Sequence, residues 1–439
     1  MPQQMVLIEY SRGFLLIVSL VITHVCVCSE ITNRGTLSKT KGQLKKNFIV
    51  YHFHLQYTCY LMKKWLKTLY VDLSALVLGA LLAFAFAPYE VFPFAVICPA
   101  GLLALWLKES PQRASWLGFT FGLGYFGAGV YWVFHSIHVF GNVPTIVAGL
   151  ITSALIMALA LFPAAVGYTV NRYFPVNNTA KLVYAFPAIW LFSEWIRSWL
   201  CTGFPWLFLG YSQTNSPLKG FAPIFSVYGV SFAVLLTSAL LVNAVLQLRQ
   251  KAYRTAYLSL FAITVIWVTG GLCNLIPWTQ PTGQPLSVAL IQGNIPQSLK
   301  WSPDHIQLSF DRYEKLTEPL WGKDKLIIWP EAAIPMPLSQ ASGFINIMDD
   351  KAKLTGSQLI LGIPIATPDR QGYYNGAVTL GEHNEVYLKR RLVPFGEYIP
   401  SIQFLPRLFN FMNIPLSDMV AGRPDKYHSL NCRCQLRCV

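Results

Sequence analysis

Long apolar stretches alternate with short polar connectors over roughly the first two thirds of the chain. Seven of these stretches come close to, or exceed, the roughly 20 residues that cross a bilayer as a helix. We predict helices at 71–87, 91–107, 116–134, 145–170, 182–200, 221–248 and 256–276. The first two are separated by little more than "PYE". We therefore expect a tight hairpin in which Pro88 closes one helix and Pro93 lies in the first turn of the next.

After Pro285 the pattern changes to short runs rich in β-branched residues. The segments "LSVALIQGNIP", "KLIIWPEAAIP" and "SQLILGIPIA" are typical of strands, and "SPDHIQLSFDRYEKLTEPLW" has apolar residues at helical spacing. Strands that alternate with helices predict an α/β layered domain. In "YYNGAVTLGEHNEVYL" the residues "GEHN" separate two further strand-like runs, so we expect a β-hairpin there.

Composition supports a membrane protein. Of the 439 residues 54% are hydrophobic and 12% charged, against about 25% charged in soluble domains. The net charge of +14 does not predict a nucleic-acid partner, because Lys and Arg lie mostly in connectors rather than on one basic face. Alternate connectors carry ten and two of these residues. The positive-inside rule then places the start of the bundle in the cytoplasm and, after seven spans, the α/β domain on the far side.

The first 61 residues do not fit this plan. The run "GFLLIVSLVITHVCVC" is typical of either a signal-peptide core or an eighth span, and "TNRGTLSKTKGQLKKN" is a basic linker without periodicity. By contrast, "MKKWLK" at Met62 is a short basic run directly before the first predicted span. Our hypothesis is that translation begins at Met62 and that 1–61 is an over-extended leader, with a true extra anchor as the alternative.

Three ionisable residues follow strand-like runs in the α/β domain. The strand "LIIWPE" stops at Pro330 and delivers Glu331 to the edge where such sheets hold their ligands. Lys389 follows "EVYL", and Glu397 ends "PFGE", whose proline and glycine force an irregular backbone. Each has a plain alternative: a charge at a helix N-terminus, a solvated basic run and a surface ion pair, respectively. Together they predict a site with a carboxylate base.

These motifs carry a resemblance to a known family. "LIIWPEAAIP" and "YLKRRLVPFGEYIP", behind "IQGNIPQSLKW" and a helical bundle, resemble apolipoprotein N-acyltransferase, a bacterial inner-membrane enzyme that completes lipoprotein acylation. The resemblance implies a polytopic α-helical bundle joined to a periplasmic nitrilase-like αββα sandwich with a Glu-Lys-Cys triad. By this resemblance Glu331 and Lys389 are the triad glutamate and lysine. Glu397 matches a further functional glutamate, and Trp301 and Asn375 match positions around the pocket.

The implied reaction suits these residue types. A cysteine thiolate takes the acyl chain from a phospholipid such as phosphatidylethanolamine and forms a thioester, which then reacts with the free amine of the diacylglyceryl-cysteine of an apolipoprotein. Glu331 takes the thiol proton and later the amine proton, and Lys389 stabilises the oxyanion. Phospholipid and apolipoprotein are thus the implied partners, and no metal or organic cofactor is required.

The chain ends in "CRCQLRCV", which contains Cys432, Cys434 and Cys438. In the resembled family the nucleophile closes an apolar strand and is followed by Tyr-Glu, and a final spanning helix comes later. This segment is polar and basic instead, so we expect a frameshift or early end near Asn431 and an inactive chain. A zinc site lacks a second pair of ligands, and nothing in the sequence fixes the tail cysteines near Glu331.

The predicted organisation is a leader (1–61), a membrane bundle of about seven helices (62–280), a partial nitrilase-like domain (285–431) and an aberrant tail (432–439). Three rival functions remain open. A membrane-tethered carbon–nitrogen hydrolase would share the glutamate and lysine but would not need the aromatic bundle. A transporter would need broken helices in matched halves, and no repeat is visible. The third is a non-catalytic product.

The apolar stretch at 182–200 contains two charged residues, Glu194 and Arg197 in "SEWIRSW". Charges are costly in lipid, so we expect them to face each other or a crevice near the outer surface, and their spacing permits a pair. Cys98, Cys201 and Cys273 lie in or beside predicted spans, where a small apolar side chain explains them.

Overall fold

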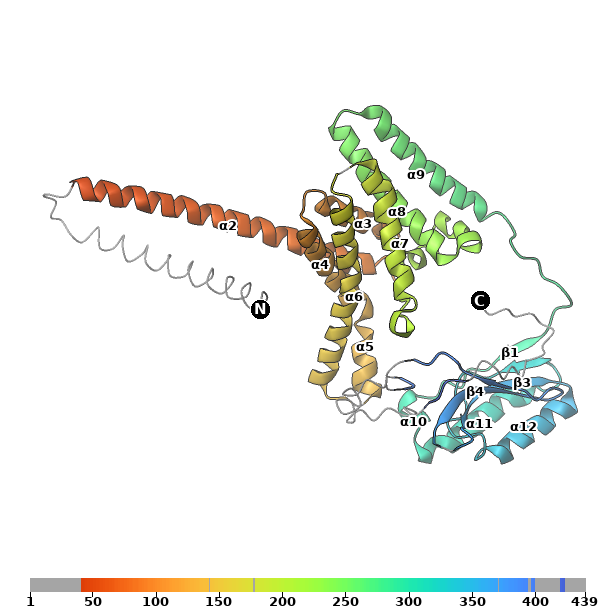
Figure 1. Cartoon of the computed structure of the whole chain (residues 1–439). Coiled ribbons are helices and arrows are strands. Elements are labelled where there is room, and N and C mark those ends of the chain that lie inside the picture. Colours follow the sequence, from red (N-terminus) through yellow and green to blue (C-terminus); the bar gives the residue numbers. More distant parts are fainter. Residues whose placement is uncertain are drawn as a thin grey trace. The chain divides into compact units, whose positions relative to one another are not determined.

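The computed structural model describes residues 41–141, 143–176, 178–369, 371–393, 396–398 and 419–422 (Figure 1). The chain divides into two compact units, Met1–Tyr70 and Val71–Val439. The described part of the first unit belongs to helix α2 (Lys41–Ala83). The expectations for residues 1–40, and for the tail 432–439 with its three cysteines, fall outside the described residues.

Helix α2 corrects one expectation about the leader. The segment "KGQLKKN" was expected to be an irregular linker, but the helix begins at Lys41 and runs through it. Lys, Gln and Leu all have good helix propensity, and no proline interrupts the segment. The more apolar C-terminal part of the same helix, Leu61–Ala83, is long enough to cross a membrane.

Helices make up the chain between α2 and the sheet domain. The α-helices are α3 (Pro93–Trp106), α4 (Pro111–Val130), α5 (Trp132–His135), α6 (Thr145–Tyr173), α7 (Phe186–Arg197), α8 (Ala222–Arg249) and α9 (Tyr253–Cys273). Two π-helices, η1 (Ser136–Phe140) and η2 (Ala180–Ala185), and three 3₁₀-helices, η3 (Leu200–Thr202), η4 (Leu209–Gln213) and η5 (Pro217–Phe221), connect them. Pro93 lies in the first turn of α3, as predicted, and the Ala87–Pro88 peptide bond is cis.

All seven predicted apolar stretches coincide with helices, but they differ in length. In the described residues four helices are long and apolar enough to span a membrane, and a fifth span results if the pair Pro111–Val130 and Trp132–Phe140, bent by 50°, counts as one. The stretches predicted at 91–107 and 182–200 form the shorter α3 and α7, with 14 and 12 residues in each helix. The chain thus contains a membrane helical region.

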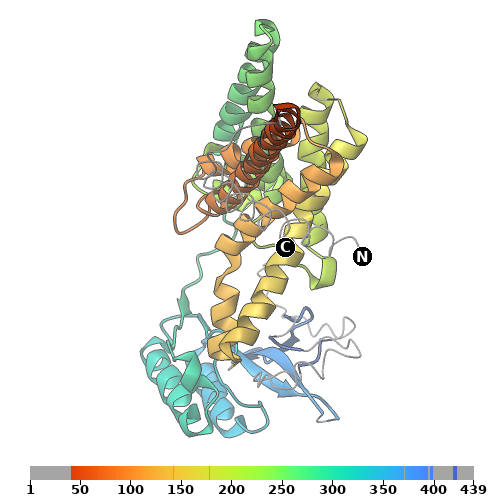
Figure 2. The same cartoon turned by 90° about the vertical axis from the view of Figure 1, so that its left-hand side faces the viewer.

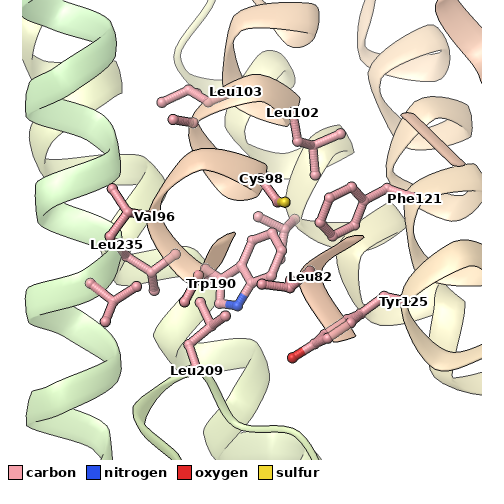
Figure 3. Close-up of a cluster of buried hydrophobic side chains, with 14 of the residues drawn as sticks. Leu82, Val96, Cys98, Leu102, Leu103, Phe121, Tyr125, Trp190, Leu209 and Leu235 are labelled. Atoms are coloured by element: carbon pink, nitrogen blue, oxygen red, sulfur yellow. The ribbon is translucent and has the colours of Figure 1, made fainter. Parts of the chain in front are cut away.

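The bundle core depends on small residues and large rings. On α4, a Cβ added at Gly118 would lie 2.3 Å from the backbone oxygen of Pro163 in α6, so glycine permits this close approach. Figure 3 shows aromatic and aliphatic side chains gathered between the helices, with Phe121, Tyr125 and Trp190 among them. The rings of Phe121 and Trp190 meet edge to face with centroids 6.1 Å apart.

The sheet has five strands in the order β1-β2-β3-β4-β5. The strands are β1 (Val288–Leu290), β2 (Leu326–Ile328), β3 (Gln358–Ala366), β4 (Tyr373–Leu380) and β5 (Val386–Leu388). The first three are parallel, and β4 and β5 are antiparallel to their neighbours. The hairpin predicted at "GEHN" is confirmed, because this segment joins β4 to β5.

Helices α11 (Ile306–Thr317) and α12 (Ser342–Thr355) form the two crossovers between the parallel strands. Successive right-handed crossovers in one direction place their helices on one face of the sheet, and both views show them there (Figures 1 and 2). Strand residues such as Ile327 and Leu361 are fully buried in one apolar core with Met348 of α12. An α/β sheet domain is therefore present, and the four-layered nitrilase-like sandwich stays a prediction.

Candidate active site

Glu331 follows the central parallel strand β2. Trp329 is anchored to β3 by a hydrogen bond from its N–H to the Ile360 oxygen (2.8 Å), and Pro330 then ends the ladder. The backbone turns sharply here, since Ala332 has φ = 48°. The Glu331 side chain is 64% exposed, so its carboxylate is available to solvent or to a substrate.

Asn375 and Lys389 come from the antiparallel half of the sheet. Asn375 lies in β4 and is buried, and Lys389 follows β5 directly. The Lys389 N–H donates to the backbone oxygen of Asn375 (2.8 Å), which extends the hairpin ladder and brings the two side chains together. The hairpin therefore sets the lysine beside the amide.

Four polar side chains form one hydrogen-bonded constellation. Lys389 Nζ lies 3.1 Å from Glu331 Oε1 and 2.8 Å from Glu397 Oε1. Asn375 Nδ2 donates to the same two oxygens, to Glu397 Oε1 at 2.8 Å and also to Glu331 Oε1. One ammonium and one amide thus bridge two carboxylates. The structure therefore brings together four of the five predicted site residues.

Glu397 is the most enclosed carboxylate of this group. Its side chain is 13% exposed, and its Oε2 accepts a hydrogen bond from the backbone N–H of Val393 (2.7 Å). The Glu397 backbone oxygen also accepts from the N–H of Met419 (3.1 Å). With both carboxylate oxygens already bonded, Glu397 is suited to holding Lys389 in place.

The constellation keeps its lysine charged. Partial burial lowers the pKa of Lys389, but hydrogen bonds and charge from Glu397 and Glu331 outweigh it and leave the pKa raised. Burial raises the pKa of Glu397, yet hydrogen bonds from Lys389, Asn375 and the Val393 backbone outweigh it and leave that pKa lowered. An ammonium fixed between two carboxylates can stabilise a developing oxyanion.

Trp301, the fifth predicted site residue, takes a different place. It follows α10 (Gln297–Lys300), and the described contacts give it no hydrogen bond to the four residues above. Its neighbour Lys300 does reach them, because Lys300 Nζ donates to the backbone oxygen of Glu331 (3.4 Å) and lies 6.0 Å from the centre of the Trp301 ring. Lys300 was not predicted from the sequence, although its position in "QSLKW" beside Trp301 was an available signal.

The described cysteines lie in the helical region. Cys98 is buried in α3, Cys201 is exposed in η3, and Cys273 ends α9. The sequence has no cysteine between Cys273 and Cys432, so the described part of the sheet domain contains no thiol. Within the described residues no group of three or more His, Cys, Asp or Glu side chains is arranged to hold a metal ion.

Glu194 and Arg197 form a second polar cluster, in the bundle. Both are buried, with 2% and 4% exposure. Arg197 donates to the backbone oxygens of Trp206 (2.6 Å) and Leu207 (3.4 Å), and Glu194 accepts from the N–H of Leu209 (3.0 Å). The ion pair that their spacing permits is not among the salt bridges of the described residues. Each side chain binds the irregular segment that follows α7.

Comparison with known proteins identifies the family. The family model described as "Apolipoprotein N-acyltransferase N-terminal domain" matches residues 78–240. A curated apolipoprotein N-acyltransferase of Coxiella burnetii is 43% identical over 353 residues, which are 80% of this chain and 72% of the relative. Those of Azotobacter vinelandii and Vibrio cholerae are each 39% identical over 360 residues, covering 81% and 80% of this chain and 69% and 70% of the relatives. The chain therefore belongs to the apolipoprotein N-acyltransferase family.

Proposed function

We propose that this chain carries the acyl-activating groups of an apolipoprotein N-acyltransferase. The observation that carries the proposal is the bridge that Lys389 and Asn375 make between Glu331 and Glu397. It sets an exposed carboxylate beside a fixed ammonium, the combination that acyl transfer needs. The named relatives support the same activity.

In the proposed reaction Glu331 is the general base and Lys389 the oxyanion stabiliser. Glu331 takes the proton of a cysteine thiol, whose sulfur attacks the ester carbonyl of a phospholipid. Lys389 holds the negative oxygen until the C–O bond breaks, and Glu331 returns the proton to the leaving lysophospholipid alkoxide. The α-amine of a diacylglyceryl-cysteine then attacks the thioester, Glu331 accepts the amine proton, and the thiolate leaves. Asn375 and Glu397 hold the side chains of Glu331 and Lys389 in place. Trp301 is proposed to line the pocket.

We further propose that the polypeptide of this sequence does not form the thioester. Glu331 and Lys389 activate and stabilise, but neither replaces a positioned nucleophile. The described part of the sheet domain contains no thiol, and Cys432 and Cys434 lie in a polar, basic sequence where a buried strand is expected. A non-catalytic product and a tethered carbon–nitrogen hydrolase are the alternatives that the experiments must separate.

The proposed location is the bacterial inner membrane, crossed several times, with the sheet domain in the periplasm. The ten-to-two distribution of Lys and Arg between alternate connectors supports this orientation. A reporter that is active only in the cytoplasm, fused near Gln340 between β2 and α12, should give no signal. A cytoplasmic signal at this position would reverse the assignment, and a fusion near Glu109, in a connector assigned to the cytoplasm, is the positive control.

The activity is tested by expressing the full chain in membranes that contain a fluorescent phospholipid. We expect no hydroxylamine-sensitive fluorescent protein band, because no thioester forms. A labelled band that disappears in Cys432→Ser or Cys434→Ser would show that a tail cysteine is the nucleophile. Release of ammonia from small amides, abolished by Glu331→Gln, would favour the hydrolase instead.

A further inference from the structure

The backbone that carries Glu331 has an unusual shape. Ala332, the next residue, has φ = 48°, a left-handed conformation that costs a non-glycine residue energy. Glu331 also passes very close to the neighbouring strand. A Cβ added at Gly362 in β3 would lie 2.6 Å from the nitrogen of Ala332 and 2.7 Å from the Cα of Glu331. A turn with an unfavourable backbone conformation needs stabilising contacts from the surrounding structure.

Lys300 supplies such a contact from outside the sheet. Its Nζ donates to the backbone oxygen of Glu331 at 3.4 Å, although the two residues lie 31 positions apart in sequence. The lysine is half-buried, its Nζ lies 6.0 Å from the Trp301 ring centre, and its residue precedes Trp301 at the end of α10. Burial lowers the pKa of Lys300, and the charge of Glu331 acts in the opposite direction. The contact joins the side-chain nitrogen of Lys300, as donor, to a backbone carbonyl at the strained turn.

We propose that Lys300 is a positioning residue that holds the Glu331 turn through the Glu331 carbonyl and so keeps the Glu331 carboxylate against Lys389. The proposal rests on the proposed function only in giving Glu331 a catalytic task. The geometry itself is independent of that task, because the link from Lys300 to Glu331 to Lys389 consists of two contacts in the structure.

This role predicts an effect of a particular sign on Lys389. Lys389 faces two anionic groups, Glu331 and Glu397, which raise its pKa. If Lys300 acted only as a nearby positive charge, its removal would raise the pKa of Lys389 further. If Lys300 holds Glu331 in place, its removal lets the Glu331 carboxylate move away, and the pKa of Lys389 falls. The two roles therefore shift the same quantity in opposite directions.

The experiment measures the pH profile of Lys389 modification by an amine-reactive reagent, using the full chain in detergent and quantifying the peptides by mass spectrometry. The profile midpoint reports the pKa, whereas changes in access alter only the plateau. Lys323, an exposed lysine of the same domain, is the internal reference. The variants are Lys300→Met, Lys300→Arg, Glu331→Gln and the double variant Lys300→Met/Glu331→Gln.

We expect the Lys389 midpoint to fall in Glu331→Gln and in Lys300→Met, and to stay at the wild-type value in Lys300→Arg, which keeps the charge and the donors. In the Glu331→Gln background Lys300→Met should cause no further fall, because the two residues act through the same contact. A midpoint that rises or does not move in Lys300→Met, or that does not move in Glu331→Gln, would overturn the proposal. The readout needs no acyl transfer, so failure of the proposed function would leave this result intact.

Discussion

The bundle and the sheet domain each contain a glutamate beside a basic residue, and the two sites use these residues differently. Glu194 and Arg197 are nearly inaccessible, and their described partners include backbone groups of the segment 206–209. Glu331 and Lys389 bond to other polar side chains, and the carboxylate is 64% exposed. Residue type alone therefore does not identify a reactive site. Burial and the identity of the partners separate a charge that maintains the fold from one that is available for chemistry.

The largest effect should come from the buried cluster. Arg197→Met leaves the backbone oxygen of Trp206 without its donor, weakens the bonding of the Leu207 oxygen, which keeps the Tyr125 hydroxyl, and removes the cation near the buried Glu194. Breaking a buried charge arrangement in this way costs about 3–5 kcal/mol. Thermal unfolding in detergent should show this loss. Arg172→Ala, at the exposed end of α6, is the matched control and should leave the unfolding temperature unchanged. Equal unfolding temperatures of the two variants would refute the structural role of Arg197.

A smaller but clear effect is expected at Gly362, which lies against Glu331. Gly362→Ala places a Cβ within 2.7 Å of backbone atoms of Glu331 and Ala332, which cannot move without shifting the turn. Overpacking of this kind destabilises by about 1–3 kcal/mol. Gly343→Ala in α12 is the control, because nothing lies within 4 Å of its added Cβ. If both substitutions leave the free energy of unfolding of the sheet domain unchanged, the close approach at Gly362 is not a constraint.

The pH dependence of stability distinguishes Glu397 from an ordinary surface carboxylate. Burial raises its pKa, but the hydrogen bonds from Lys389, Asn375 and Val393 leave it below the ordinary value of 4.5. The folded state then binds fewer protons than the unfolded state below about pH 4.5, so the stability that Glu397 contributes is lost as pH falls through its lowered pKa. Chemical unfolding at several acidic pH values should show this loss in the wild type and a smaller one in Glu397→Gln. Glu382→Gln, at the exposed hairpin turn, should behave like the wild type.

The smallest effect on stability is expected for the proposed base itself. Glu331→Gln removes one partner of an exposed ion pair, and such pairs contribute about 0–1 kcal/mol. The free energy of unfolding of the sheet domain should therefore change by less than about 1 kcal/mol. A loss as large as that of Arg197→Met would mean that Glu331 is a structural charge, and the contrast between the two clusters would disappear.

Much of the sheet and three positions of the candidate site, Glu331, Lys389 and Glu397, could be predicted because they depend on local signals. Pro330 stops an apolar strand directly before Glu331, and "GEHN" fixes the hairpin that presents Lys389. The place of Asn375 came from the family resemblance alone, because an asparagine in a β-strand carries no local sign of function. The contact of Lys300 with Glu331 spans 31 positions and arises only once the crossover through α11 has formed.

The bundle was less predictable in its details. Apolar length indicated helices correctly, but it did not indicate that α7 ends at Arg197 and is followed by an irregular segment. In that segment Cys201, Thr202 and Leu207 adopt positive φ although none is glycine. At Leu207 the backbone oxygen is held by Arg197 and by the Tyr125 hydroxyl, both from other parts of the chain, so no local sequence pattern reports this conformation.

The central proposal, that Glu331 and Lys389 are acyl-transfer groups, is tested most directly by providing a thiol at the end of an apolar strand. The chain is joined at Asn431 to an apolar strand ending in Cys-Tyr-Glu and to the rest of a family-type domain, and thioester formation from a fluorescent phospholipid is timed. We predict hydroxylamine-sensitive labelling that slows by about 10²–10⁴-fold in Glu331→Gln, the range for loss of a general base. Equal labelling rates with Glu331 and with Gln at this position would contradict the account.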